Sequence, residues 1–299
     1  MMNWSGVLPA ITTPFQEDFT VDHDFLAAHA RWMVDAGCSG IVALGSLGEG
    51  ATLAFDEKVA VLRTCVRSLD GRVPVVAAIA ALSTRDAVRL AEAAQNAGCS
   101  GLMILPPYVY TSDWREMKAH VDAVLGATAL SCMLYNNPVA YRTDFLPEQI
   151  AELAAMHPNL HAVKESSTDV RRITAIRALI GERLTISVGV DDLIVEGIAA
   201  GATGWIAGLV NAFPVESVRL FELATSGQRE EARALYEWFL PLLRLDTVPK
   251  FVQLIKLVQQ QVGMGSEIVR APRLLLEGAE RTAALDVIRA SLESRPADA

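Results

Sequence analysis

The feature that most constrains the fold is an alternation of a short apolar segment with a longer amphipathic one, which occurs eight times along the chain. Apolar runs predict buried strands, and apolar residues three to four positions apart predict helices. Strands are expected at 7–12, 41–44, 73–79, 101–105, 131–135, 160–164, 184–188 and 203–207. Helices are expected at 22–35, 57–68, 84–96, 114–125, 146–156, 170–179, 192–199 and 215–225. Eight strand–helix units favour an α/β fold, the closed (β/α)8 TIM barrel.

Short glycine-containing turns separate several helices from the strands that follow them. The motif Ala-Gly-Cys-Ser-Gly at 36–40 recurs at 97–101, and 200–204 is a looser third copy. The first glycine of each copy can take the left-handed conformation that ends a helix, so loop geometry explains the repeat. An open, doubly wound sheet is the alternative, because the number of strands alone does not exclude it.

Beyond residue 226 the pattern is purely helical. Further helices are expected at 228–245, 251–262 and 283–293. We therefore predict a barrel over 1–226 and a C-terminal helical extension over 227–299 that packs on the barrel or forms subunit contacts. The apolar face of the first of these helices is expected to be core or interface, and we assign the extension no chemistry.

Composition narrows the class of partner. Of the 299 residues, 52% are hydrophobic, and the formal net charge is -9. This acidic balance argues against nucleic acid or an anionic membrane surface as the main partner. The N-terminus lacks the basic and apolar regions of a secretory signal, and no apolar run reaches the roughly 18 residues that a membrane span needs. We expect a cytoplasmic protein that acts on a small molecule.

Cysteine and histidine are sparse and scattered. The four cysteines stand singly in apolar surroundings, with no Cys-x-x-Cys pair, and are expected to be buried thiols. Neither His157 nor His161 has an acidic or histidine partner at helical metal-ligand spacing. We therefore expect no metal site.

In a TIM barrel the chemistry lies at the carboxyl ends of the strands, and the most informative such residue is Lys164. It ends the expected strand at 160–164 and is followed by Glu165 and small polar residues. Burial at a barrel mouth lowers the pKa of a lysine, so that its free amine can attack a carbonyl or an imine and form a Schiff base. Alone, a lysine beside a glutamate is more often an ordinary ion-paired residue.

Two other strand ends carry compatible groups. The loop 45–50, Gly-Ser-Leu-Gly-Glu-Gly, follows the second strand, and its backbone amides and the Ser46 hydroxyl suit a carboxylate. It lacks the signatures of a phosphate loop or a dinucleotide site. Tyr135 ends the fifth strand and can donate a hydrogen bond or transfer a proton. A glycine-rich turn and a tyrosine are each common as structural features, but together with Lys164 they form the set that Schiff-base chemistry on a 2-oxo acid requires.

Further motifs extend this set into a family resemblance. From Gly6 to about Arg273 the chain resembles the dihydrodipicolinate synthase and N-acetylneuraminate lyase family of class I aldolase-type barrels. The matching segments are Leu-Pro-Ala-Ile-Thr-Thr-Pro-Phe at 8–15, the loop 45–49, Tyr-Asn-x-Pro at 135–138, Val-Lys-Glu at 163–165, Gly-Val-Asp-Asp at 189–192 and Pro-Lys-Phe at 249–251.

The resemblance implies a role for each candidate residue. Lys164 would be the Schiff-base lysine and Tyr135 the phenol that transfers protons. The loop from Gly45, with the backbone of Ser46 and Leu47, would bind the substrate carboxylate, and Ile206 would be a pocket wall. The resemblance also implies a protein that is commonly a homotetramer, and the lysine chemistry needs no metal or organic cofactor.

Three positions depart from the synthases of that family. The second of two hydroxyl residues in the carboxylate loop is Leu47 here, the tyrosine given by a neighbouring subunit falls on Val109, and the substrate-binding arginine falls on Ala140. Whether Tyr110 or Tyr141 enters the pocket in place of the missing groups stays open. The departures argue against a lysine-biosynthetic synthase.

Within the family, the chain most resembles the 1-pyrroline-4-hydroxy-2-carboxylate deaminases of bacterial hydroxyproline degradation. The segments at 135–138, 204–214 and 238–243 carry this closer resemblance. It implies a Schiff-base deamination that yields 2,5-dioxopentanoate and ammonia, with Ser46 assisting Tyr135. The alternatives are a pyruvate-dependent aldolase, a 2-keto-3-deoxy sugar acid dehydratase, a dihydrodipicolinate synthase, or a non-catalytic sensor built on the same fold.

Overall fold

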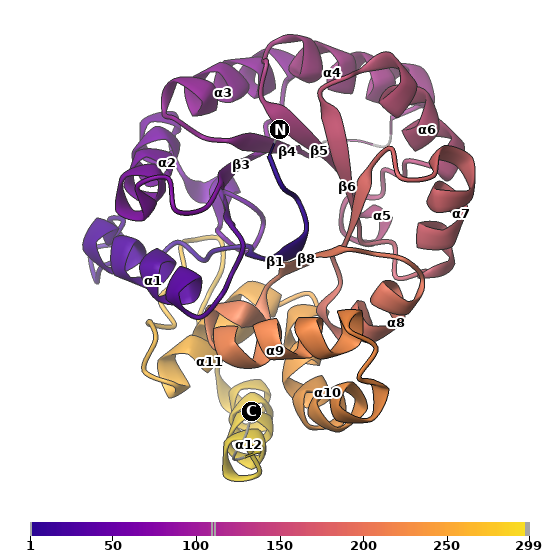
Figure 1. The fold of residues 1–299 in the computed structure, drawn as a ribbon. Helices are drawn as coiled ribbons and strands as arrows, with labels where there is room; N and C mark the ends of the chain where they lie inside the picture. The colour runs from indigo at the N-terminus through magenta and orange to yellow at the C-terminus, as the bar shows by residue number, and fades with distance from the viewer. Residues whose placement is uncertain (1, 109, 111, 297–299) are drawn as a thin grey trace.

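Eight parallel strands form a ring at the centre of the molecule (Figure 1). The computed structural model describes residues 2–108, 110 and 112–296. The strands are β1 (Gly6–Pro9), β2 (Ile41–Ala43), β3 (Val75–Ile79), β4 (Gly101–Ile104), β5 (Ser131–Asn136), β6 (Leu160–Glu165), β7 (Thr185–Val188) and β8 (Gly204–Ala207). Their order in the sheet is β1-β8-β7-β6-β5-β4-β3-β2.

The ring closes between β1 and β2. A parallel bridge joins Ala10 to Val42, and the N–H of Ile11 donates to the Val42 carbonyl at 3.0 Å. An open, doubly wound sheet would leave these two strands as unpaired edges. The predicted TIM barrel is therefore confirmed, and the open-sheet alternative is wrong.

Helices surround the ring of strands. They are α1 (His23–Asp35), α2 (Phe55–Leu69), α3 (Thr84–Asn96), α4 (Trp114–Gly126), α5 (Pro138–Tyr141), α6 (Pro147–Met156), α7 (Arg171–Ile180), α8 (Ile194–Ala199) and α9 (Pro214–Thr225). The short helix α5 was not predicted. The side chain of Asn137 caps it by accepting from the N–H of Ala140 at 2.9 Å, and Pro138 opens it at the position where proline is favoured.

The register of β5 and β6 brings two candidate residues together. Tyr135 pairs with Lys164, and Lys164 pairs in turn with Ser187 on β7. All three side chains are buried, because helices cover the outside of the barrel and apolar side chains fill its interior. Strand pairing alone therefore places a phenol beside an amine.

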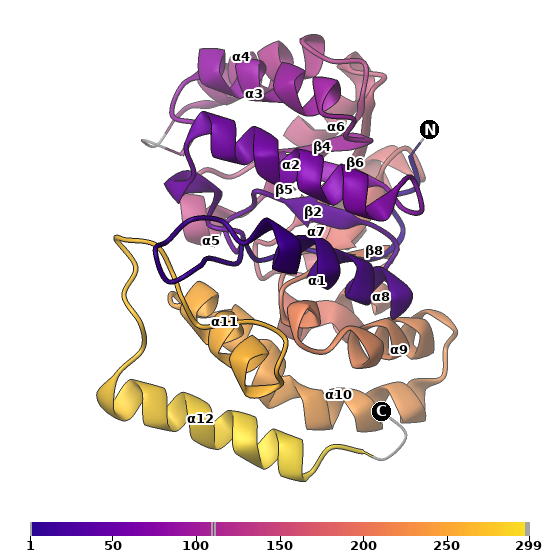
Figure 2. The same cartoon turned by 90° about the vertical axis from the view of Figure 1, so that its left-hand side faces the viewer.

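Three helices follow the barrel: α10 (Arg229–Leu243), α11 (Phe251–Gln261) and α12 (Gly278–Glu293). Figure 2 shows α12 farthest from the strands, with α11 between it and the barrel. The predicted apolar face of α10 is core, because Leu235, Phe239 and Leu242 are buried within the chain. The predicted start of α12 at 283 is wrong: Gly278, with a φ of 55°, opens the helix five residues earlier. The domain division at residue 226 stays a prediction.

A buried ion pair ties this extension to the barrel. Nζ of Lys256, on α11, lies 2.6 Å from Oε1 of Glu49, and the two side chains are 2% and 0% exposed. Lys256 also donates to the Ile268 carbonyl at 2.7 Å, and the N–H of Arg270 donates to Oε2 of Glu49 at 3.0 Å. The loop 45–50 is thus held from outside the barrel. Throughout the described residues, every helix is too short or too polar to span a bilayer.

We predict that Lys256→Met destabilises the protein strongly. The substitution leaves the Glu49 carboxylate buried without its partner, which typically costs about 3–5 kcal/mol in the free energy of unfolding. Lys250→Met is the matched control, because Lys250 pairs with Glu280 and their side chains are 50% and 47% exposed, so the loss should stay below about 1 kcal/mol. Urea unfolding followed by circular dichroism measures both. Equally small losses in the two variants would contradict the prediction.

Candidate active site

A cavity of about 540 Å³ opens at the carboxyl ends of the strands. Its lining includes every residue singled out from the sequence as catalytic or substrate-binding: Gly45, Ser46, Leu47, Tyr135, Lys164 and Ile206. They come from the ends of β5, β6 and β8 and from the loop after β2. The structure thus brings all six together, while their chemical roles stay predictions.

Lys164 is the penultimate residue of β6 and is only 6% exposed. Burial lowers the pKa of its amine to about 8, against the opposing effect of the negative charges of Asp246 and Asp191. Gly189 makes room for the side chain, since a Cβ there would lie 2.5 Å from Cε of Lys164. The site therefore contains an amine that is partly unprotonated near neutral pH.

Tyr135 faces this amine. Nζ of Lys164 lies 4.2 Å from the centre of the tyrosine ring, and the phenol oxygen accepts from Nδ2 of Asn137 at 3.1 Å. Burial raises the pKa of the phenol, and the hydrogen bond from Asn137 partly offsets this. The phenol is thus held neutral beside the lysine, in a position to exchange a proton with a group bound to it.

Tyr141, on α5, links Ser46 to Tyr135. Its hydroxyl and the Ser46 hydroxyl form a hydrogen bond, and its ring packs edge-on against the Tyr135 ring with centroids 5.8 Å apart. Tyr110 is 55% exposed and does not line the cavity. Of Tyr110 and Tyr141, the two candidates to replace the missing groups, Tyr141 is therefore the one that enters the pocket within this chain. Val109, which aligns with the tyrosine that a neighbouring subunit gives in the synthases, lies outside the described residues.

The loop after β2 forms the expected cradle. In the described residues, the backbone N–H groups of Ser46 and Leu47 donate to no protein acceptor, so both are available to a bound carboxylate. The Thr13 hydroxyl donates to the Gly48 carbonyl at 2.6 Å, and Glu49 is fixed by Lys256. Because the loop is anchored on both sides, its two free amides are pre-positioned for an anion.

Asp191, three residues beyond the end of β7, is buried and holds the start of the loop after β8. Its carboxylate accepts from Nε1 of Trp205 at 3.0 Å and from the N–H groups of Gly208 and Leu209 at 3.0 and 2.8 Å. Burial raises its pKa to about 6, while these hydrogen bonds act in the opposite direction. Asp191 belongs to the motif at 189–192 that resembles the family, but the sequence assigned this residue no role.

Asp246 is a cavity residue that our sequence reasoning missed. It ends a 3₁₀ turn, η4 (Arg244–Asp246), between α10 and α11, and it lines the cavity together with Val248, Phe251 and Arg273. The extension therefore contributes residues to the lining of the candidate site, which the sequence did not lead us to expect. The only signal in the sequence was a charged residue in the connection just before the matching segment 249–251.

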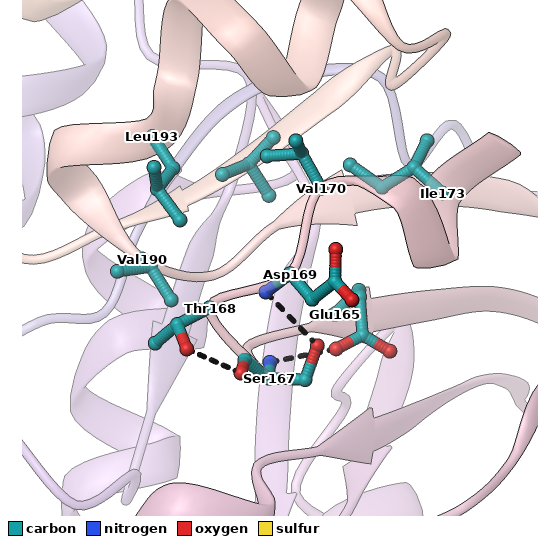
Figure 3. Close-up of a pocket in the computed structure, with 9 residues that line it drawn as sticks. Glu165, Ser167, Thr168, Asp169, Val170, Ile173, Val190 and Leu193 are labelled. Atoms are coloured by element: carbon teal, nitrogen blue, oxygen red, sulfur yellow. Dashed lines mark hydrogen bonds between the residues drawn. The ribbon is translucent and has the colours of Figure 1, made fainter.

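A second, much smaller hollow lies beside the strand that carries the lysine (Figure 3). Its volume of about 10 Å³ is room for about one water molecule. The N–H of Ser167 donates to Oε1 of Glu165 at 2.6 Å, and Glu165 also accepts from Nδ2 of Asn136 at 3.1 Å. Val170, Ile173 and Leu193 form its apolar side. These contacts fix the loop after Lys164, and the hollow is too small for a substrate.

The cysteines are buried thiols, as predicted. All four are free, and burial raises the pKa of each to about 12, so they are poor nucleophiles. Across 2–108, 110 and 112–296, no group of three or more His, Cys, Asp or Glu side chains is arranged to hold a metal ion.

Comparison with known proteins gives the family. A sequence model of the dihydrodipicolinate synthetase family matches residues 3–291. The chain belongs to this family. It is 35% identical over 230 residues to a 4-hydroxy-tetrahydrodipicolinate synthase of Saccharophagus degradans, which covers 77% of this chain and 79% of the relative. It is 30% identical to that of Geotalea daltonii, over 96% of this chain and 98% of the relative.

Solved structures of the dihydrodipicolinate synthetase family share the fold over nearly the whole chain. The dihydrodipicolinate synthase DapA-2 of Bacillus anthracis superposes with a TM-score of 0.93 at 26% identity, covering 99% of this chain and 100% of that one. YagE, a prophage protein of E. coli K12 that was solved with pyruvate, superposes with a TM-score of 0.91 at 25% identity, covering 97% and 99%. The protein is thus an enzyme of this lyase-type, Schiff-base aldolase family, while the closer resemblance to deaminases stays a prediction.

We predict that the rate at which borohydride traps a pyruvate adduct on Lys164 depends on pH with a midpoint near 8. Because burial lowers the pKa from 10.5 to about 8, the free-amine fraction should rise about tenfold from pH of about 7 to about 9 and then level off. Mass spectrometry of trapped protein gives the rate, and Lys164→Met is the blank. A rate that still climbs steeply above pH of about 9 would mean that the pKa is unshifted.

We also predict that Tyr141→Phe slows proton transfer, because it removes the hydroxyl that joins Ser46 to the Tyr135 ring. The exchange of pyruvate methyl protons in D2O, followed by proton NMR, reports this step without any further substrate. A loss of about a hundredfold is expected, the lower end of what a positioned acid or base contributes. Tyr110→Phe is the comparison and should exchange at the wild-type rate. The reverse pattern would show that Tyr110 enters a neighbouring subunit's site instead.

Proposed function

We propose that this family member deaminates 1-pyrroline-4-hydroxy-2-carboxylate, releasing 2,5-dioxopentanoate and ammonia, with Lys164 as the Schiff-base nucleophile. The observation that carries the proposal is the composition of the cavity. A buried amine, a phenol and a loop suited to one carboxylate line it, together with the apolar Leu47 and Ala140. The family resemblance aligns these two positions with polar groups of the synthases. Such a cavity suits a compact substrate with a single carboxylate.

The reaction begins with the substrate carboxylate on the N–H groups of Ser46 and Leu47, which directs C2 toward Nζ of Lys164. Attack on C2 opens the ring and leaves a protonated Schiff base, with the former ring nitrogen as an amine on C5. The positive Schiff base acidifies C3 and acts as the electron sink. The lysine thus supplies the activation that an organic cofactor would otherwise provide.

Elimination and hydrolysis complete the sequence. Tyr135, assisted by Ser46 through Tyr141, takes a proton from C3 while its own phenol proton passes to the 4-hydroxyl, which leaves as water. The conjugated product tautomerises to an imine at C5. Water releases ammonia from C5 and 2,5-dioxopentanoate from Lys164, so one water is consumed overall for one substrate.

Dihydrodipicolinate synthesis is the second candidate, because the curated relatives described above are named as synthases. In that reaction the same Lys164 would hold pyruvate and condense it with aspartate semialdehyde. Arg273 lines the cavity and is the cation that could meet a second carboxylate, but its Nη1 lies 3.8 Å from Oε2 of Glu49. An arginine already facing a buried carboxylate is a weaker anchor, so the deaminase is the better fit.

The test is to incubate the enzyme with 4-hydroxy-1-pyrroline-2-carboxylate and, separately, with pyruvate plus aspartate semialdehyde. We expect ammonia equal to the substrate consumed, a borohydride-trapped adduct on Lys164, and no condensation product. Lys164→Met should give neither ammonia nor adduct. Condensation without ammonia would establish the synthase. A pyruvate adduct on Lys164 without either reaction would favour an aldolase or a sugar acid dehydratase instead. We also propose a homotetramer, which light scattering would measure.

A further inference from the structure

We propose that Asp246 is a further catalytic residue, the acid that protonates the ring nitrogen expelled from C2 when Lys164 attacks. This inference rests on the proposed deaminase function and deepens it. It assigns chemistry to the C-terminal extension and implies a substrate whose leaving group at C2 is a nitrogen base.

The position of Asp246 carries the inference. Among the described residues that line the cavity, Asp246 provides the only carboxyl group. Within the described chain, its Oδ1 is buried and has no hydrogen-bond partner. A buried oxygen without a partner is costly, and a bound substrate that shares a hydrogen bond with it would offset that cost.

The backbone just after β8 leaves room for this carboxyl group. A Cβ on Gly208 would lie 2.2 Å from Oδ1 and 2.4 Å from Cγ of Asp246, so any side chain at position 208 would displace the acid. The same Gly208 donates its N–H to Asp191 at 3.0 Å. The barrel therefore leaves a space that the side chain of Asp246, from outside the barrel, fills.

The charges that face Asp246 keep its proton available. Burial raises the pKa of Asp246 well above its usual value, and the negative charges of Asp191 after β7 and Asp192 act in the same direction. Lys164, on β6, opposes them, and Arg244 on the same turn lies 3.6 Å from Asp192. Burial and the neighbouring carboxylates thus favour the protonated form of Asp246, which is the form that the ring-opening step needs.

The ring-opening step conserves protons and charge. The free amine of Lys164 bonds to C2, the electron pair of the C2–N double bond moves to the ring nitrogen, and that nitrogen takes the proton of Asp246. A second proton passes from Nζ to the same nitrogen through the new carboxylate. The C2–N bond then breaks with its electron pair on nitrogen. The products are a protonated Schiff base, a primary amine on C5 and a carboxylate at Asp246, and the net charge is unchanged.

Tyr135 and Tyr141 also line the cavity, but burial raises the pKa of both phenols. A phenol is a weaker acid than a carboxyl group and a poorer donor to a leaving amine. Two proton-transfer groups with different environments can serve two different atoms of one substrate. Tyr135 would thus transfer the proton of C3, and Asp246 would protonate the ring nitrogen.

The experiment compares the wild type with Asp246→Asn, which keeps the shape and removes the acid, and with Asp246→Ala as a second variant. Asp286→Asn is the matched control, because it makes the same change at an exposed carboxylate of the extension that does not line the cavity. Ammonia release gives kcat and KM, and borohydride with pyruvate gives the fraction of Lys164 trapped after long incubation. Circular dichroism checks the fold of each variant.

We expect both Asp246 variants to lose kcat by about a hundredfold or more, with KM changed far less and with the pyruvate adduct still formed. Asp286→Asn should keep its activity. An Asp246→Asn kcat within threefold of the wild type overturns the inference. A parallel loss of the pyruvate adduct overturns it too, since Asp246 would then act by holding Lys164. If the wild type releases no ammonia, both the deaminase function and the role of Asp246 are wrong. If the wild type is active and Asp246→Asn is unaffected, only the role of Asp246 is wrong.

Discussion

Closure of the ring between β1 and β2 is the constraint on which the rest of the structure depends. Parallel hydrogen bonding gives every strand the same direction, and a closed ring has no edge, so all eight strands end at one mouth. Tyr135 and Lys164 are neighbours there because β5 and β6 pair in that register. The chemistry of the site thus follows from strand pairing before any loop is considered.

Burial at this mouth sets the reactivity of the lysine. An amine in water stays protonated at neutral pH, and desolvation is the effect that lowers its pKa to about 8. Asp191 and Asp246 oppose that effect, but Asp191 spreads its charge over three N–H donors from β8 and the loop that follows it. The amine is therefore buried near carboxyl groups without being locked into an ion pair by either of them.

The parts that sequence predicted are those that depend on local periodicity. The eight units and the helix at 84–96 followed from apolar spacing, and the candidate residues Lys164 and Tyr135 followed from their positions at strand ends. The placement of Asp246 depends on the packing of a turn in the extension against Gly208, about forty residues earlier in the chain. No periodic pattern encodes such a contact. The same holds for Tyr141, whose place depends on the short helix α5.

The residues of the cavity come from two parts of the chain, the barrel and the C-terminal extension. The amine, the phenol and the cradle belong to the barrel, and they supply what any Schiff-base reaction on a 2-oxo acid needs. Asp246, Val248 and Arg273 come from the extension, which the Glu49–Lys256 pair holds against the cradle loop. A change of residue in the extension can therefore alter which leaving group is protonated, or which second anchor is offered, without disturbing the strands. The strands that the chain shares with the solved synthase structures and the extension residues of the cavity are thus separate parts of the sequence.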